Sequence, residues 1–249
     1  MKDSDVLPEV LLLPGLLCDE RLWAAQAEAL AGLARSGIPD LTPYESIATM
    51  ADSVLSEAPE RFALAGFSMG GCVALEVFGR APDRVSRLAL LSTNAGGLLP
   101  PVRRRLQDSI DRIEAGGLDD YLRDAFPSYV APEHTNDRTL RETFANMGNS
   151  LGQAVAVRQM RALLEYPGFG GSLERIACPT VLICGREDRR TPVAAHEKMA
   201  KLIPGAKLRV IDRSGHFTPL EKPEAVADAL RGWLNMPVQN FVDMDENRG

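Results

Sequence analysis

The chain has 249 residues, of which 45% are hydrophobic and 25% are charged, and its formal net charge at pH 7 is −6. This length and composition are typical of one large globular domain, or of a domain with an inserted lobe. The acidic balance argues against nucleic acid as a partner, because neutralising phosphate groups requires a basic face.

The N-terminal segment lacks the pattern of a secretory signal. Its apolar run is interrupted by Pro14-Gly15 and follows acidic residues, whereas a signal peptide has basic residues before an unbroken apolar stretch. No run in the sequence reaches the roughly 20 apolar residues that span a bilayer. The sequence therefore predicts a cytoplasmic protein that has no membrane as a partner.

Short apolar runs predict the strands of a mostly parallel sheet. Near-continuous runs of about four to six apolar residues are typical of strands that are covered on both faces. Such runs lie at residues 10–13, 61–65, 87–92, 180–184 and 207–211, and a possible sixth strand lies near residues 38–41.

Helical patterns separate these runs. Apolar residues at positions 47, 50, 51, 54 and 55 share one helix face, and another helix is expected over residues 70–80. Thr191-Pro192 predicts a helix start with a capping hydroxyl, and Pro223 opens the last helix. The alternation of strands and helices predicts an α/β fold with a doubly wound sheet.

Residues 98–167 interrupt this alternation with helical stretches and no convincing strand. One helix is expected over residues 102–113, a second around residues 140–147 and a longer third over residues 151–166. We interpret this block as an all-helical cap inserted into an α/β core of residues 1–97 and 168–236. The acidic residues 237–249 are expected to form a loose, flexible tail.

The four cysteines, at positions 18, 72, 178 and 184, lie far apart in the chain and show no CxxC spacing. Three of them stand within apolar runs. Buried, reduced thiols are therefore favoured over disulfides or a metal site.

A serine flanked by glycines stands between a predicted strand and a predicted helix, in the pattern Gly66-Phe67-Ser68-Met69-Gly70. A serine on a sharp strand-to-helix turn needs small neighbours, which the two glycines supply. Such a turn lifts the hydroxyl above the strand ends and next to the helix N-terminus. Ser68 is therefore the candidate nucleophile.

A serine hydroxyl needs a base at neutral pH, and the chain has three histidines. His134 lies in a polar stretch of the helical block and is expected on the solvated surface. His196 falls inside a predicted helix and faces no obvious partner. His216 follows the last predicted strand on a glycine-containing loop, at the same sheet edge as Ser68, and is the candidate base.

The base needs an orienting acid from the same sheet edge. Asp188 follows the predicted strand at 180–184, and Glu187 beside it is the alternative acid. Asp212 stands too near His216 along the chain to reach its Nδ1, and is interpreted as a turn residue.

The chain order serine, aspartate, histidine is that of α/β-hydrolases. With the motifs "LLLPGLLCDERLW", "GFSMGG", "GREDRRTP" and "SGHFTPLEKPE", the sequence resembles the α/β-hydrolase fold superfamily, as a small carboxylesterase-like member with a helical cap. The resemblance implies an oxyanion hole formed by the backbone N–H groups of Leu16 and Met69, with Leu17 as the alternative to Leu16. Many relatives have His-Gly where this chain has Pro14-Gly15.

The expected reaction is cleavage of a carboxylic ester, thioester or lactone of a small molecule through an acyl-serine, with no metal and no cofactor. Candidate substrate contacts are Leu17, Phe126, Phe144 and Phe217, although cap residues of this kind more often pack the helices together. Arg189 and Arg190 could meet an anionic group or simply lie exposed. The sequence does not predict the oligomeric state.

Two alternative functions use the same scaffold. One is a cofactor-free oxygenase or peroxidase, or a hydrolase of C–C bonds, because the fold hosts many chemistries. The other is a ligand sensor that retains the three reactive residues.

Overall fold

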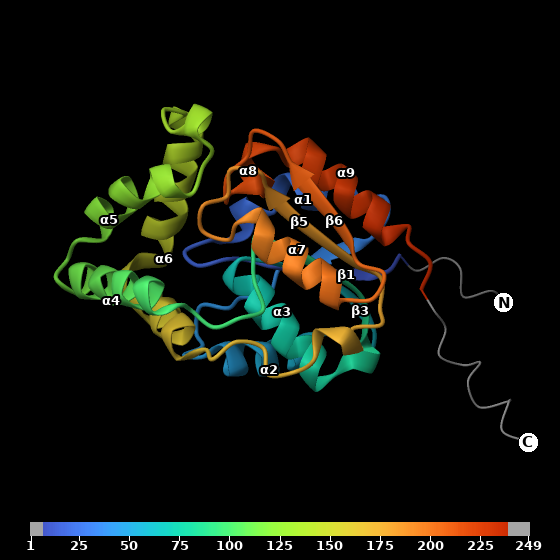
Figure 1. Ribbon diagram of the computed structural model, residues 1–249. Coiled ribbons are helices and arrows are strands. Elements are labelled where there is room, and N and C mark those ends of the chain that lie inside the picture. The colour runs from blue at the N-terminus through green and yellow to red at the C-terminus, as the bar shows by residue number, and fades with distance from the viewer. Residues whose placement is uncertain (1–6, 239–249) are drawn as a thin grey trace, which may run out of the picture.

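The computed structural model describes residues 7–238 as a six-stranded sheet with helices on both faces and a helical block beyond one edge (Figure 1). All neighbouring strands are parallel, in the order β2-β1-β3-β4-β5-β6. The strands are β1 (Glu9–Leu13), β2 (Arg35–Gly37), β3 (Phe62–Phe67), β4 (Val85–Leu91), β5 (Thr180–Gly185) and β6 (Lys207–Ile211). The predicted α/β class with a mostly parallel sheet is confirmed.

The burial of the strands explains which of them the sequence reveals. Every residue of β3 and β5 is buried, so both strands are continuous apolar runs. The possible sixth strand exists as β2, but its expected bounds near residues 38–41 are wrong, because β2 ends at Gly37. As an edge strand of three partly exposed residues, β2 has no apolar pattern, and only its backbone pairing with β1 defines it.

The direction of the connections decides which helices cover which face of the sheet. The helices of the core are α1 (Ala24–Leu30), α2 (Ile47–Glu57), α3 (Met69–Arg80), α7 (Val193–Leu202), α8 (Thr218–Glu221) and α9 (Pro223–Leu234). The chain steps outward to β2 through α1 and then returns the other way through α2, α3 and α7. Right-handed crossovers in opposite directions put helices on opposite faces. Accordingly, α1 packs beside α9 on one face and α2 beside α3 on the other (Figure 1).

The segment between β4 and β5 consists of helices and the loops that join them. It forms α4 (Pro100–Glu114), α5 (Leu118–Ala125) and α6 (Arg138–Glu165), which pack on one another at the left of Figure 1. An antiparallel bridge between Gly96 and Gly168 joins the two segments that connect this block to the core. We call these helices the cap. Its division from the core at residues 98 and 167 stays a prediction, and residues 239–249 of the predicted tail lie outside the described residues.

The two helices expected around residues 140–147 and over residues 151–166 are the two segments of α6, which are separated by a kink. Helix α6 has non-helical angles at Gly152, with φ 80° and ψ 173°. Such a backbone conformation is essentially restricted to glycine. The prediction of two helices in this segment is therefore confirmed, and Gly152 is the residue that separates them.

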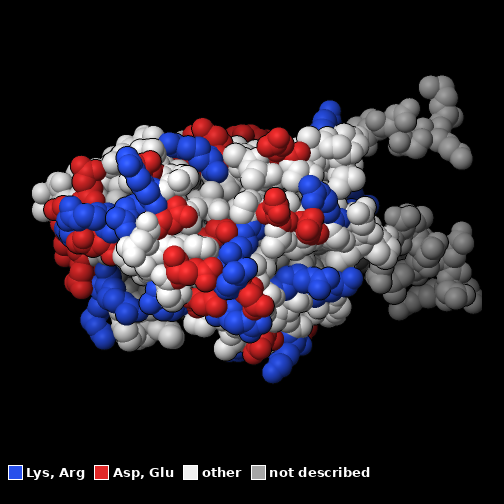
Figure 2. Space-filling view, turned by 90° about the horizontal axis from the view of Figure 1, so that it is seen from above, with Lys and Arg blue, Asp and Glu red and all other residues white. Residues whose placement is uncertain are grey.

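Charges and thiols are distributed as the composition suggests. Basic and acidic side chains intermingle on the face drawn in Figure 2. All four cysteines are free; three are buried and Cys178 is partly exposed. Among residues 7–238, no helix is long and apolar enough to cross a membrane.

Candidate active site

The turn that carries Ser68 is strained and tightly packed. Ser68 lies between β3 and α3 with φ 53° and ψ −113°, a backbone conformation that L residues rarely adopt. A Cβ at Gly66 would lie 2.3 Å from the carbonyl oxygen of Gly70, and a Cβ at Gly70 would lie 2.4 Å from that of Leu13. Both glycines are therefore required by close backbone approach, and the turn leaves Ser68 partly exposed at the carboxyl edge of the sheet.

The structure brings the three predicted reactive residues into one hydrogen-bonded chain. The Ser68 hydroxyl oxygen lies 2.9 Å from His216 Nε2. His216 Nδ1 lies 2.9 Å from Asp188 Oδ2. The side chains of His216 and Asp188 are 2% and 0% exposed, so the hydrogen bonds lead from a buried acid to the partly exposed Ser68. This arrangement lets the imidazole take the serine proton while the carboxylate fixes its orientation.

Backbone and hydroxyl donors surround the Asp188 carboxylate. Its Oδ1 accepts the N–H groups of Arg190 and Thr191, at 2.8 and 2.9 Å, and Oδ2 accepts the Thr191 hydroxyl at 2.7 Å. Burial by itself would raise the pKa of Asp188, but the charge of His216 and these hydrogen bonds outweigh it and hold the pKa well below its usual range. The expected capping role of Thr191 is wrong, because α7 begins at Val193 without a side-chain cap.

The other two acids that the sequence analysis considered, Glu187 and Asp212, have partners other than His216. Glu187 Oε2 accepts the N–H of Ser214 at 2.9 Å, which holds the loop before His216. Asp212 forms an exposed ion pair with Arg186. Asp188 is therefore the acid whose carboxylate contacts the imidazole.

The loop after β1 lies beside the N-terminus of α3, where an oxyanion hole is expected. The N–H of Cys18 closes a turn on the carbonyl of Gly15 at 3.1 Å. The N–H groups of Leu16 and Met69 make no hydrogen bond within residues 7–238, whereas the Leu17 N–H donates to Gln159 Oε1 at 2.9 Å. Of the two open alternatives, the geometry favours Leu16 over Leu17.

His196 has a hydrogen-bond partner, contrary to the expectation from the sequence. It is fully buried, and its Nε2 accepts the N–H of Thr93 at 3.1 Å. The Thr93 hydroxyl in turn donates to the carbonyl of Ser68 at 2.8 Å. Burial lowers the pKa of His196, which fits a neutral ring that accepts a hydrogen bond. His196 on α7 thus supports the turn that carries Ser68.

The expectation that His134 is a solvated surface residue is also wrong. Its side chain is 18% exposed, and Nδ1 lies 2.8 Å from Glu221 Oε2. The same carboxylate accepts the N–H groups of Ala131 and Gly215, at 2.7 and 2.8 Å. Burial raises the pKa of Glu221, although these hydrogen bonds oppose the rise. Glu221 therefore joins the cap to the residue before His216.

The predicted substrate contacts are all buried. Leu17, Phe126, Phe144 and Phe217 are each 1% exposed or less. Phe144 and Phe217 have ring centroids 5.3 Å apart, which joins the cap to the core beside His216. Their role as substrate contacts stays a prediction.

The two arginines after Asp188 contact the cap. Arg189 donates to the carbonyl of Pro127 at 2.8 Å, and the guanidinium of Arg190 lies 4.0 Å from the ring centroid of Tyr129. Both residues are exposed, as one of the two alternatives expects, and a contact with an anionic group stays a prediction.

Four polar side chains that support the site were missed by the sequence analysis: Thr191, His196, Gln159 and Glu221. Only Thr191 carried a local signal, because a threonine three residues after an aspartate is typical of a turn closed on the carboxylate. The other three act on residues far away in the chain, where no spacing rule applies.

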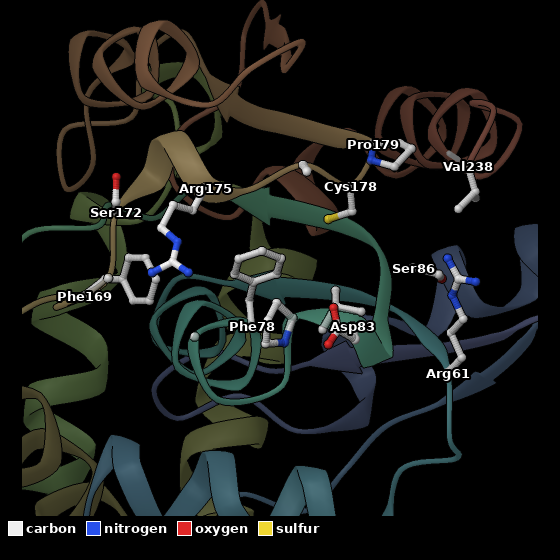
Figure 3. A pocket seen from close by; sticks show the side chains of 15 residues that line it. Arg61, Phe78, Asp83, Ser86, Phe169, Ser172, Arg175, Cys178, Pro179 and Val238 are labelled. Atoms are coloured by element: carbon white, nitrogen blue, oxygen red, sulfur yellow. The ribbon is translucent and has the colours of Figure 1, made fainter. Parts of the chain in front are cut away.

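A separate cavity of about 310 Å³ opens at the opposite edge of the sheet, near the amino ends of β4 and β5. Figure 3 shows Arg175 and Phe169 at one end of it and Arg61 and Val238 at the other. None of its lining residues belongs to the hydrogen-bonded chain of Ser68. Within residues 7–238, no three His, Cys, Asp or Glu side chains are grouped as metal ligands would be.

Comparisons with known proteins identify the family of the chain. A family model described as the alpha/beta hydrolase family matches residues 10–229. A pimeloyl-(acyl-carrier protein) methyl ester esterase of Aromatoleum aromaticum is 28% identical over 251 residues, covering 90% of this chain and 99% of that protein.

Solved structures show the same architecture. An esterase from Thermogutta terrifontis has a TM-score of 0.85 at 27% identity, covering 94% of this chain and 91% of that one. A bromoperoxidase from Bacillus anthracis has a TM-score of 0.79 at 17% identity, covering 93% of each chain. The second likeness concerns the fold alone, which hosts more than one chemistry.

Proposed function

Because this chain belongs to the alpha/beta hydrolase family, we propose that it is a serine hydrolase that cleaves a carboxylic ester, or a related thioester or lactone, of a small molecule. The observation that carries the proposal is the continuous hydrogen-bonded chain from Ser68 through His216 to Asp188. In the proposed reaction these three residues are nucleophile, general base and orienting acid.

The first half of the reaction forms an acyl-enzyme. His216 Nε2 takes the proton of Ser68 as Oγ attacks the carbonyl carbon of the substrate, and Asp188 stabilises the charged imidazole. The negative oxygen of the tetrahedral intermediate is bound by the N–H groups of Leu16 and Met69. His216 then protonates the leaving alcohol, and the acyl group stays on Ser68.

The second half returns the free enzyme. His216 takes a proton from water, which attacks the acyl carbon, and the proton passes to Ser68 as the acid leaves. Each oxyanion donor contributes about 2.7–4 kcal/mol to transition-state stabilisation in hydrolases of this type. The names of the relatives, a methyl ester esterase and an esterase, support an ester as the scissile bond.

Replacement of the nucleophile tests the proposal. Ser68→Ala should abolish nearly all hydrolysis of short-chain nitrophenyl esters, because Ser68 carries the only hydroxyl within residues 7–238 that is hydrogen-bonded to His216 Nε2. A fluorophosphonate should label the wild type at Ser68, as located by peptide mass spectrometry, and should not label the variant. A panel of esters, thioesters, lactones and amides then defines the class of bond.

Ser92→Ala is the matched control, since Ser92 also follows a strand at the same sheet edge with a positive φ of 45°. This variant should keep the fluorophosphonate label on Ser68. Turnover by Ser68→Ala at the rate of the wild type would disprove the assignment. Binding of esters with a gain in thermal stability but no turnover would favour the ligand sensor instead.

A further inference from the structure

The cap contacts the oxyanion loop, which we define as residues 14–21, at two places along α6. Gln159 Oε1 accepts the N–H of Leu17 at 2.9 Å. On the other side of the kink at Gly152, the guanidinium of Arg21 donates to the carbonyl of Asn146 at 3.1 Å and to the Ser150 hydroxyl at 2.8 Å. Both halves of α6 therefore bind the same loop.

Gln159 is a polar side chain at a core position. It is 1% exposed, and its neighbours Ala156 and Met160 on α6 are fully buried. Burying a carboxamide is costly unless its polar atoms are hydrogen-bonded. Because only the carbonyl oxygen can accept from an N–H group, the orientation of the carboxamide is fixed by the Leu17 contact.

The residue that Gln159 binds has an unusual backbone. Leu17 has a φ of 58°, in the left-handed region that non-glycine residues rarely adopt. Such conformations persist where surrounding contacts stabilise them. The hydrogen bond fixes the peptide group between Leu16 and Leu17. The preceding peptide group, between Gly15 and Leu16, carries the Leu16 N–H and is joined to the first at the Leu16 Cα. Orienting the first peptide therefore constrains the direction of the Leu16 N–H.

We propose that Gln159 is a positioning residue, which holds the oxyanion loop from the cap and aims the Leu16 N–H at the oxyanion. The inference rests on the proposed function, because it assigns a role within the same reaction. It also makes transition-state stabilisation depend on the placement of α6, so that the cap contributes to the rate as well as to substrate choice.

Gln159→Leu tests this role, since it removes the acceptor and keeps a side chain of similar size. With a nitrophenyl ester, kcat should fall about 10- to 100-fold, somewhat less than for the loss of a whole oxyanion donor. KM should change by less than about threefold, because the interaction is made in the transition state. Affinity for an alkyl boronic acid, whose tetrahedral adduct on Ser68 places an oxygen in the hole, should fall in parallel with kcat/KM.

Gln153→Leu is the matched control, because Gln153 lies on the same helix with an exposed side chain. It should leave kcat, KM and boronic acid affinity unchanged. A kcat for Gln159→Leu within twofold of the wild type, or a loss confined to KM, would overturn the positioning role.

Amide hydrogen exchange gives a readout that needs no turnover. The Leu17 N–H should exchange slowly in the wild type and in Gln153→Leu, and much faster in Gln159→Leu, because only the last variant loses its acceptor. Equal exchange in all three proteins would overturn the inference by itself. A wild type that hydrolyses no ester, thioester or lactone would instead disprove the proposed function, and the exchange result would still decide whether Gln159 holds the loop.

Discussion

At the scale of single residues, the carboxylate of Asp188 shows how a buried acid stays ionised. It accepts hydrogen bonds from the backbone of Arg190, from the backbone and hydroxyl of Thr191, and from His216. These donors favour the charged form more than burial disfavours it, so the pKa lies well below its usual range. Across the pH range in which the imidazole can act as a base, Asp188 therefore remains a negative acceptor that fixes the ring.

Asp188→Asn should reduce kcat by about 10³- to 10⁴-fold, because a carboxamide turned toward the ring no longer selects the tautomer that accepts the serine proton. The expected measurement is steady-state hydrolysis of a nitrophenyl ester at pH 7.5. Fluorophosphonate labelling of Ser68 should slow in the same proportion.

Glu187→Gln is the control for this prediction. Glu187 accepts a hydrogen bond from the backbone of Ser214 and does not contact the imidazole. Glu187→Gln should therefore lower kcat far less than Asp188→Asn does. Equal losses in the two variants would contradict the assignment of Asp188 as the orienting acid.

At the scale of elements, the sequence predicts what local patterns determine. The strands β1, β3, β4 and β5 are found because most of their residues are buried between the helical layers and form apolar runs. The edge strand β6 has no buried residue and is found only from its apolar residues Leu208, Val210 and Ile211. The turn at Ser68 is found because close backbone approach requires its two glycines.

Other elements depend on contacts between distant segments, which no local pattern reveals. Strand β2 is three residues long and is defined by pairing with β1. His196 and His134 stand in polar or helical sequence that suits an exposed residue, yet their partners are Thr93 and Glu221, 103 and 87 residues away. For the same reason the link from Gln159 to the oxyanion loop could not be predicted.

The kink in α6 gives a prediction at this scale. Gly152→Ala should lower the free energy of unfolding by about 1–3 kcal/mol, because φ 80° with ψ 173° is a conformation that alanine avoids. There is open space around the missing Cβ, so the cost comes from the backbone and not from a clash. Urea denaturation followed by circular dichroism measures the change.

Gly232→Ala is the matched control. Gly232 lies within α9 with open space around it, so alanine there should stabilise the protein by about 0.5–1 kcal/mol. If Gly152→Ala were also stabilising, the bend of α6 would not be a requirement of the fold.

At the scale of the whole molecule, the cap and the sheet share one hydrophobic core. Cap residues such as Phe126, Phe144 and Met160 belong to the same buried cluster as Leu12 of β1 and Leu90 of β4. Polar contacts from Gln159, Glu221 and Arg21 add to this interface. We therefore expect the core to unfold as one cooperative unit. The cytoplasmic location and the absence of nucleic acid or membrane as a partner stay predictions from composition.

The thiols provide a test of that cooperativity. Burial raises the pKa of Cys72 to about 11 and that of Cys184 to about 12, and it raises the pKa of Cys18 further. At pH 8 these three thiols are therefore protonated, buried and unreactive toward a disulfide reagent such as dithiobis(nitrobenzoate). Cys178, which is partly exposed, should react first, although burial raises its pKa to about 11 as well.

As the urea concentration rises, the three buried thiols should become reactive over the same range of concentration in which the circular dichroism signal is lost. The reason is that exposing any of them requires opening the shared core. All four thiols should react in the fully denatured chain. Cys178→Ser should remove the early reaction and leave the cooperative one unchanged. Reaction of Cys18, Cys72 or Cys184 well before the unfolding transition would show that part of the core opens alone, against a single cooperative unit.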